Sequence, residues 1–209
     1  KVAFGTLRAL GGSAIPVTSA VTVDGGATLD IAAAQEIGSL AGAGSVTLSG
    51  GSLTAGGNGT STLFSGTISG VGGLTKKGAG TLTLGGFNSY AGLTSIAAGT
   101  LALSSGGTIV GAVDNGASFA NAGNVRGQVT NRASLTSTGR LDGGLVNAAT
   151  SIANLSGVWN GAISNAGTVR LSGLTSGNVA FNQQGSGLFD LAGSFASIGS
   201  LAGSGSVQL

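Results

Sequence analysis

Short runs of alternating apolar and polar residues recur along the whole chain and are separated by small turns of Gly, Ala and Ser. Residues 81–84 read Thr-Leu-Thr-Leu and residues 100–103 read Thr-Leu-Ala-Leu, so that Leu stands at every second position. Successive side chains of a β-strand point to opposite faces, so this alternation buries one face and leaves the other in water. The pattern therefore predicts many short β-strands joined by tight turns.

Residues 111–182 carry the clearest internal repeat, with a period of 16 to 18 residues. Aligning the repeat on its glycines produces three apolar columns. The first column holds Val113, Val129, Leu145 and Ile163, the second Phe119, Leu135, Ile152 and Val169, and the third Val125, Leu141 and Val158. Apolar positions about six residues apart predict three short strands per coil, which form the walls of a three-sided parallel β-solenoid. Left-handed hexapeptide β-helices share this spacing, so the period leaves the handedness open.

A column of asparagines runs through the same repeat. Its members are Asn115, Asn131, Asn147, Asn165 and Asn182. Asn tolerates the left-handed backbone of a turn and can bond the main chain, and copies on coils about 4.8 Å apart can bond each other. We interpret the column as an asparagine ladder. The alternative is that Asn and Gly simply accumulate at turns.

The remainder of the chain is built of similar material. Residues 37–48, IGSLAGAGSVTL, recur at residues 198–209 as IGSLAGSGSVQL. We therefore expect one all-β domain over residues 1–209, a rod of about ten coils. Its expected parts are irregular coils at 1–110, regular coils at 111–182 and further, truncated coils at 183–209. Because the chain stops within an expected strand, we expect the natural protein to continue.

Composition supports an elongated repeat protein over a globular domain. The chain has 43 Gly, only 7% charged residues and a mean hydropathy of +0.44. So much Gly disfavours one deep core, whereas a solenoid needs only a narrow one. The net charge of +2 comes from few groups, so we expect no nucleic-acid partner. The only adjacent basic pair is Lys76-Lys77, which we interpret as a solvated turn. The alternative is that this pair contacts anionic glycans.

The sequence argues against catalysis. It has no His and no Cys, which excludes Ser-His-Asp and Cys-His nucleophile systems and removes the main zinc ligands. The six acidic residues are Asp24, Asp30, Glu36, Asp114, Asp142 and Asp190, and their spacing predicts no converging carboxylate pair or calcium cluster. We therefore expect a protein without enzymatic activity, metal or cofactor.

Three polar or aromatic residues are candidates for a surface contact stripe. Arg126, Asp142 and Trp159 each directly follow a residue of the third apolar column, so we expect them to point outward on neighbouring coils. Arg126 and Asp142 would then form an exposed ion pair, and Trp159 would be a binding anchor. The alternative for Trp159 is that it packs against a neighbouring loop.

One stretch is recognisable as well as regular. Residues 73–101 read as a Gly-x-Gly-Thr-Leu-Thr-Leu strand, a Phe-Asn-x-Tyr corner and an Ala-Gly-Thr-Leu strand. This order closely resembles the passenger-associated repeat of bacterial autotransporters, over about residues 68–103. The resemblance implies a single-stranded right-handed parallel β-helix. The sequence departs mildly from the family pattern: Ser89 and Ala91 stand beside Tyr90 where Thr is frequent, and Leu93 stands where Gly is common. We expect these departures to leave the fold intact and to affect only the corner.

The resemblance also implies a function and a location. Such a segment would be a passenger exported through the outer membrane to the cell surface by a C-terminal β-barrel of the same polypeptide, which is absent here. Family passengers often act as adhesins, so we expect a rigid stalk and secretion scaffold with an extended binding face for a host-surface protein or glycan. A self-association module that binds a copy of itself on another cell is the alternative, and a secreted carbohydrate-active β-helix enzyme is a more remote one.

Overall fold

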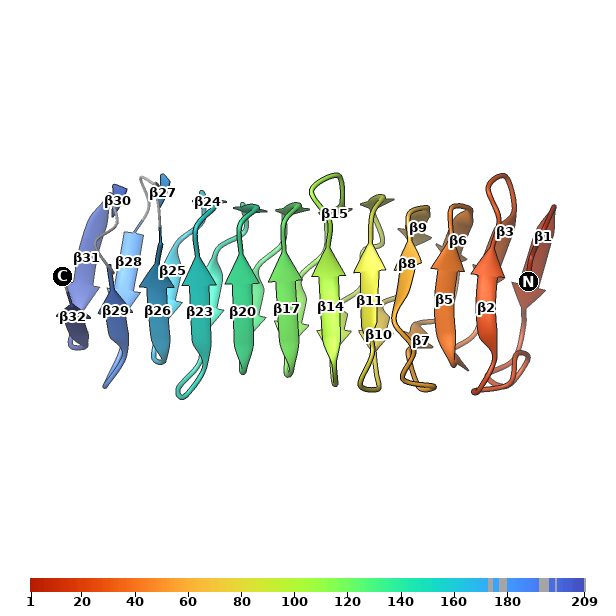
Figure 1. Ribbon diagram of the computed structural model, residues 1–209, viewed down its shortest axis with the longest axis horizontal. Helices are drawn as coiled ribbons and strands as arrows, with labels where there is room; N and C mark the ends of the chain where they lie inside the picture. The colour runs from red at the N-terminus through yellow and green to blue at the C-terminus, as the bar shows by residue number, and fades with distance from the viewer. Residues whose placement is uncertain (173–174, 177–179, 192–195, 198, 209) are drawn as a thin grey trace.

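The computed structural model describes residues 1–172, 175–176, 180–191, 196–197 and 199–208. The described residues form 32 strands and no helix, and they wind into a long rod with the two termini at opposite ends (Figure 1). None of these residues forms a helix that is long and apolar enough to cross a membrane. The fold is an all-β parallel solenoid of about ten turns, as predicted. The right-handed sense of the coil stays a prediction.

The walls of the rod are parallel sheets, which we call walls A, B and C. Wall A holds β2 Ala20–Val23, β5 Ser39–Gly42, β8 Thr62–Phe64, β11 Thr81–Leu84, β14 Thr100–Leu103, β17 Ser118–Asn121, β20 Ser134–Ser137, β23 Ile152–Leu155, β26 Thr168–Leu171, β29 Leu188–Asp190 and β32 Ser206–Gln208. Wall C holds β4 Gln35–Ile37, β7 Leu53–Ala55, β10 Leu74–Lys76, β13 Thr94–Ile96, β16 Val113–Asn115, β19 Val129–Asn131, β22 Leu145–Asn147, β25 Ile163–Asn165, β28 Ala180–Gln183 and β31 Ser200–Gly203.

Wall B consists of two sheets in succession. The first holds β1 Thr6–Ala9, β3 Thr28–Ile31, β6 Ser45–Leu48 and β9 Thr67–Gly70. The second holds β12 Phe87–Asn88, β15 Thr108–Ile109, β18 Asn124–Val125, β21 Arg140–Leu141, β24 Val158–Trp159, β27 Thr175–Ser176 and β30 Ala196–Ser197. The two sheets meet where the Ser89 amide donates to the Ile68 carbonyl at 2.8 Å. Wall B therefore continues along the rod with shorter strands.

The core is a narrow column of side chains that repeat in register from coil to coil. On wall A, Leu82 pairs with Leu101, Leu101 with Phe119, and Phe119 with Leu135, and all four are at most 2% exposed. The residues between them point outward, as the alternation of strand side chains requires. Each coil therefore buries only a few apolar residues against its neighbours, which explains how a Gly-rich chain builds a continuous core.

Two of the expected apolar columns shift by one residue after residue 147. The step between neighbouring coils lengthens from 16 to 18 residues at this point, and the turn at residues 148–151 contains both extra residues. Thr150 in this turn has a left-handed backbone, with φ 67°. As a result Ala153, not Ile152, lies in register with Leu135, and Ile152 is 38% exposed. The prediction for this column was wrong at this coil, because the sequence period does not say where an insertion is placed.

The repeated sequence of residues 37–48 forms the same corner between two different pairs of walls. In the first copy β5 lies on wall A and β6 on wall B, whereas in the second copy β31 lies on wall C and β32 on wall A. Both copies turn at a left-handed glycine, with φ 113° at Gly42 and 110° at Gly203. A Cβ at Gly42 would lie 2.0 Å from the Val23 carbonyl oxygen, so the corner requires Gly. Ile198 and Leu209 of the second copy lie outside the described residues.

Candidate functional site

A continuous row of polar side chains lies inside the rod along wall C. Asn115, Asn131, Asn147 and Asn165 end successive strands of this wall and are 0 to 1% exposed. The Nδ2 atom of each donates to the Oδ1 atom of the next, at 2.7, 2.7 and 2.8 Å in chain order. These bonds run along the axis of the rod and join each coil to the following one.

Each amide of this row also donates to the main-chain carbonyl of the first residue in the wall A strand of the following coil. The acceptors are, in order, the carbonyl oxygens of Ser134, Ile152, Thr168 and Leu188, at 2.8, 2.9, 3.0 and 2.9 Å. A buried amide without partners would be costly, and this arrangement supplies two acceptors to every Nδ2 atom. The row therefore fixes both the stacking and the corner of each coil.

The fifth member of the row is a glutamine. The Nδ2 atom of Asn165 donates to the Oε1 atom of Gln183 at 2.7 Å, across 18 residues of sequence. Asn182 pairs in register with Ser164, and its side chain is exposed on the outer face of the wall. The expected step of 17 residues placed the inward position one residue too early, so the structure puts Gln183 where the sequence suggested Asn182.

A lysine occupies the same row nearer the N-terminus. Lys76 pairs in register with Ile96, which in turn pairs with the first asparagine of the row. Its side chain is fully buried, and its Nζ atom donates to the carbonyl oxygens of Lys77, Gly78 and Ala98 at 2.8, 2.7 and 3.1 Å. The ammonium thus joins the corner of its own coil to the corner of the next, as the asparagines do further along.

The interpretation of both lysines as a solvated turn was therefore wrong for Lys76. Burial lowers the pKa of its ammonium below the ordinary value of 10.5. Only Lys77 is exposed, and its Nζ atom lies 2.8 Å from the Glu36 carboxylate. The signal that could have found Lys76 is its place in the strand: aligning Leu-Thr-Lys of β10 with Val-Asp-Asn of β16 puts Lys76 in the asparagine column.

The Phe-Asn-x-Tyr corner buries two of its polar side chains. Asn88 is 0% exposed and donates to the carbonyl oxygens of Gly86 and Thr108 at 2.9 and 3.1 Å. The hydroxyl of Tyr90, also 0% exposed, bonds the Thr94 hydroxyl. Burial raises the pKa of this phenol above its ordinary value. Hydrogen bonds of buried side chains therefore hold this corner from the core side.

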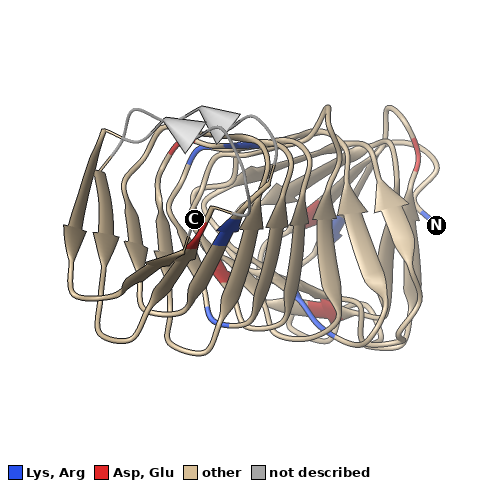
Figure 2. Ribbon diagram, turned by 60° about the vertical axis from the view of Figure 1, so that its left-hand side comes forward, with Lys and Arg blue, Asp and Glu red and all other residues tan. Residues whose placement is uncertain are grey.

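Most of the few charged side chains form ion pairs at the surface of the rod. Figure 2 shows the charged positions scattered along the rod. The ion pairs are Lys1–Asp24, Arg8–Asp30, Lys77–Glu36, Arg132–Asp114, Arg140–Asp142 and Arg170–Asp190. They use all six carboxylates of the sequence. Such exposed pairs contribute at most about 1 kcal/mol each to stability. Their main effect is a surface with few unpaired charges.

The three residues of the expected contact stripe do not come together. Asp142 accepts from Arg140 at 2.6 Å and from the side-chain amide of Asn160 at 2.6 Å. The Arg126 guanidinium lies over the Phe87 ring instead, 5.4 Å from its centroid. Neither geometry forms the expected Arg126–Asp142 pair.

Trp159 lies in the core and cannot serve as a surface anchor. It pairs in register with Leu141 and is 2% exposed, whereas its neighbour Val158 is 38% exposed. The cause is the same two-residue insertion, in the turn at residues 148–151, that shifts the wall A column of this coil. On wall A of the same coil the inward position is taken by the small residue Ala153, which is also buried.

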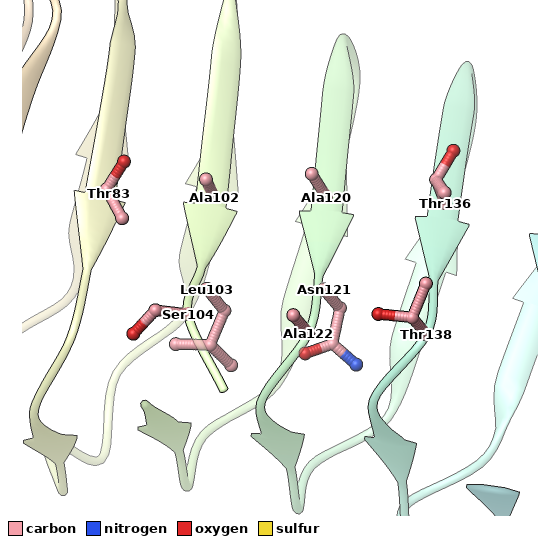
Figure 3. A pocket seen from close by; sticks show the side chains of 9 residues that line it. All are labelled: Thr83, Ala102, Leu103, Ser104, Ala120, Asn121, Ala122, Thr136 and Thr138. Carbon is pink, nitrogen blue, oxygen red and sulfur yellow. The ribbon is translucent and has the colours of Figure 1, made fainter. Parts of the chain in front are cut away.

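The outer face of wall A has a shallow apolar hollow. Thr83, Ala102, Ala120 and Thr136 occupy one outward-facing level of four neighbouring strands (Figure 3). Because the two central residues are alanines, the hollow has a volume of about 310 Å³, at the small end of the range for ligand pockets. Its lining carries no charged residue. The arrangement can receive an uncharged group but offers no acid, base or nucleophile suited to catalysis.

The part of the chain that the structure describes shows no metal-binding cluster. Within the described ranges, no three His, Cys, Asp or Glu side chains gather where they could hold a metal ion.

Comparison with known proteins identifies one part of the chain. Residues 74–103 match the family model of the passenger-associated-transport-repeat, as the resemblance implied. The match runs from β10 to β14 and so includes the buried Lys76 and the corner with the buried side chains Asn88 and Tyr90. No curated protein and no solved structure matched the chain. The chain thus carries a repeat that is typical of autotransporter passengers.

Proposed function

We propose that this chain is a stalk segment of an autotransporter passenger that acts at the bacterial cell surface as part of an adhesin. The observation that carries the proposal is the passenger-associated-transport-repeat at residues 74–103, whose strands β10, β11, β13 and β14 lie within the continuous sheets of walls A and C. A passenger of this type is exported, and a C-terminal β-barrel of the same polypeptide would bring it through the outer membrane. Residues 1–209 would act as one domain.

The geometry supports a mechanical role. Parallel walls give each interior coil main-chain bonds to two neighbours, and the buried polar row adds side-chain bonds in the same direction. Paired surface charges leave little to attract a charged ligand or substrate. A stiff rod with few unpaired surface charges separates a binding region from the membrane without needing catalytic groups. We therefore propose a segment without enzymatic activity.

Removal of one complete coil tests the stalk role. Deleting residues 148–165 joins Asn147 directly to Ala166, keeps the register of the walls and leaves Asn147 to bond Gln183. If the segment is a stalk, bacteria that display this shorter rod on its barrel should reach the wild-type surface level and should adhere and clump as the wild type does. Flow cytometry measures display, and binding to host matrix and glycans measures adhesion. Normal display with lost adhesion would contradict the stalk role.

The hollow on wall A favours a second role as a contact face. An uncharged, mostly apolar surface suits an uncharged glycan or protein, or the same face on a second copy of the chain. Ala120→Lys places a cation at its centre, because Ala120 points outward between Ala102 and Thr136. For a contact face we expect clumping or host binding to fall at least ~10-fold with unchanged display.

The control for this substitution is Ser95→Lys on the outer face of wall C. It adds the same charge to a neighbouring coil and should leave clumping and binding unchanged. If both variants behave like the wild type, wall A is no contact face and only the stalk role remains. Loss of clumping alone would assign the face to self-association, and loss of host binding alone would assign it to adhesion.

A further inference from the structure

The loop between β7 and β8 holds an Asn-Gly-Thr triplet in a folded, exposed turn. The Oδ1 atom of Asn58 accepts hydrogen bonds from both the backbone amide and the hydroxyl of Thr60, at 3.1 and 2.8 Å. Gly59 between them has φ 73°, and nothing lies within 4 Å of the place where its Cβ would be. All three residues are exposed. This is an Asx-turn at an exposed corner of the rod.

Hydrogen bonds to the preceding coil hold the loop in place. The Asn58 backbone amide donates to the Gly38 carbonyl at 3.2 Å, and its Nδ2 atom donates one hydrogen to the Ser39 hydroxyl at 3.2 Å. That long contact uses one of the two protons of the side-chain amide. The Thr60 hydroxyl meanwhile polarises the amide carbonyl, which makes the Nδ2 protons more acidic. The side chain is therefore preorganised for reaction at nitrogen.

The chain contains a second triplet that fits the pattern Asn-x-Ser/Thr, and this one lies in a β-strand. Asn154-Leu155-Ser156 lies at the end of β23, where Asn154 pairs with Thr136 on one side and Arg170 on the other. Its backbone is extended and hydrogen-bonded in the wall, so it cannot fold an Asx-turn without breaking the sheet. The two triplets separate the effect of sequence from that of conformation.

We propose that Asn58 is an acceptor site for an N-linked glycan. The Asn-x-Ser/Thr triplet is the acceptor motif for this modification, which is placed on surface loops of secreted proteins. The Nδ2 atom attacks C1 of a sugar that carries pyrophosphate at C1. The Nδ2–C1 bond forms, the C1–oxygen bond breaks, the pyrophosphate leaves with the bonding electron pair, and one Nδ2 proton passes to a base of the transferase.

This inference is independent of the proposed stalk role. A glycan on Asn58 would project from the corner between wall C and wall A and would not enter either wall. The donor is a sugar activated by pyrophosphate, and either a soluble sugar nucleotide or a lipid-linked pyrophosphate sugar supplies that chemistry. The two sources require different transferases, so the test can tell them apart.

The test incubates the folded 209-residue chain in two arms. One arm contains a soluble N-glycosyltransferase with UDP-glucose, and the other contains a single-subunit oligosaccharyltransferase with a lipid-linked oligosaccharide. Peptide mass spectrometry then measures modification at each asparagine over time. We expect sugar on Asn58 in at least one arm, at a rate at least ~10-fold above that of Asn154, and none in Asn58→Gln. The arm that reacts identifies the donor.

Gly59→Ala tests the role of the turn while the acceptor triplet stays intact. Alanine disfavours the left-handed backbone without a steric clash, so the folded variant should react at least ~3-fold more slowly. Denatured wild type and denatured Gly59→Ala should react at equal rates. The proposal is overturned if Asn58 stays unmodified in both arms, if Asn154 of the folded chain reacts as fast as Asn58, or if Gly59→Ala has no effect on the folded chain.

Discussion

Replacing Asn131 by Ala is expected to lower the free energy of unfolding by about 2–4 kcal/mol. Asn131 is fully buried, accepts a hydrogen bond from Asn115 at 2.7 Å and donates to Asn147 at 2.7 Å. The substitution removes both bonds and leaves the Ile152 carbonyl without its 2.9 Å side-chain donor. A cavity also opens in a core that is only a few side chains wide. Few surface changes could have such an effect.

The measurement is urea unfolding followed by the fluorescence of Trp159, the single Trp of the chain, which is buried on the coil after Asn147. Thr130→Ala is the matched control, because Thr130 is the adjacent residue of the same strand and points to the outer face. It should change the free energy of unfolding by less than about 0.5 kcal/mol. Equal destabilisation by the two substitutions would show that the row contributes no more than any other position of wall C.

Most of the fold follows from local sequence because a solenoid is decided by its period. Leu at alternate positions of β11 and β14 specifies strands with one buried face, and the repeat of about 16 residues specifies how they stack. Asn115, Asn131, Asn147 and Asn165 fall in one row for the same reason. An inward residue that recurs at the coil length must meet its own copy on the next coil.

The placement of added residues could not be predicted from the period. A longer coil takes its extra residues in one turn, and everything after that turn changes register by the whole insertion. The turn at residues 148–151 thereby exchanges Val158 for Trp159 in the core. A later insertion likewise puts Gln183 in the polar row in place of Asn182. A one-residue error reverses which face a side chain occupies, so it decides whether Trp159 is an anchor or a core residue.

Composition also misleads about a buried cation. Lys is almost never fully buried, so Lys76 beside Lys77 is naturally interpreted as part of a solvated turn. Three main-chain carbonyls nevertheless converge on the inward position at the end of β10. In the later coils an amide with two hydrogens serves this purpose. The hydrogen-bonding need of the corner, and not the hydropathy of the strand, selects the residue.

Lys76→Met is therefore expected to lower the free energy of unfolding by about 2–3 kcal/mol. Methionine fills a similar volume, but the carbonyls of Lys77, Gly78 and Ala98 lose their common donor inside the repeat at residues 74–103. Lys77→Met is the neighbouring control. It removes only an exposed pair with Glu36 and should cost less than about 1 kcal/mol. Urea unfolding followed by far-ultraviolet circular dichroism measures both.

The pH dependence gives the Lys76 assignment a second, independent readout. Burial lowers the folded-state pKa of Lys76 below 10.5, so between these two pKa values the unfolded chain holds more protons than the folded chain. Stability from this group therefore rises as the pH increases through that interval and is constant below it. The difference in unfolding free energy between wild type and Lys76→Met should grow with pH up to about 10.5. A difference that stays flat there would mean that Lys76 reaches solvent and does not hold the corner of the passenger repeat.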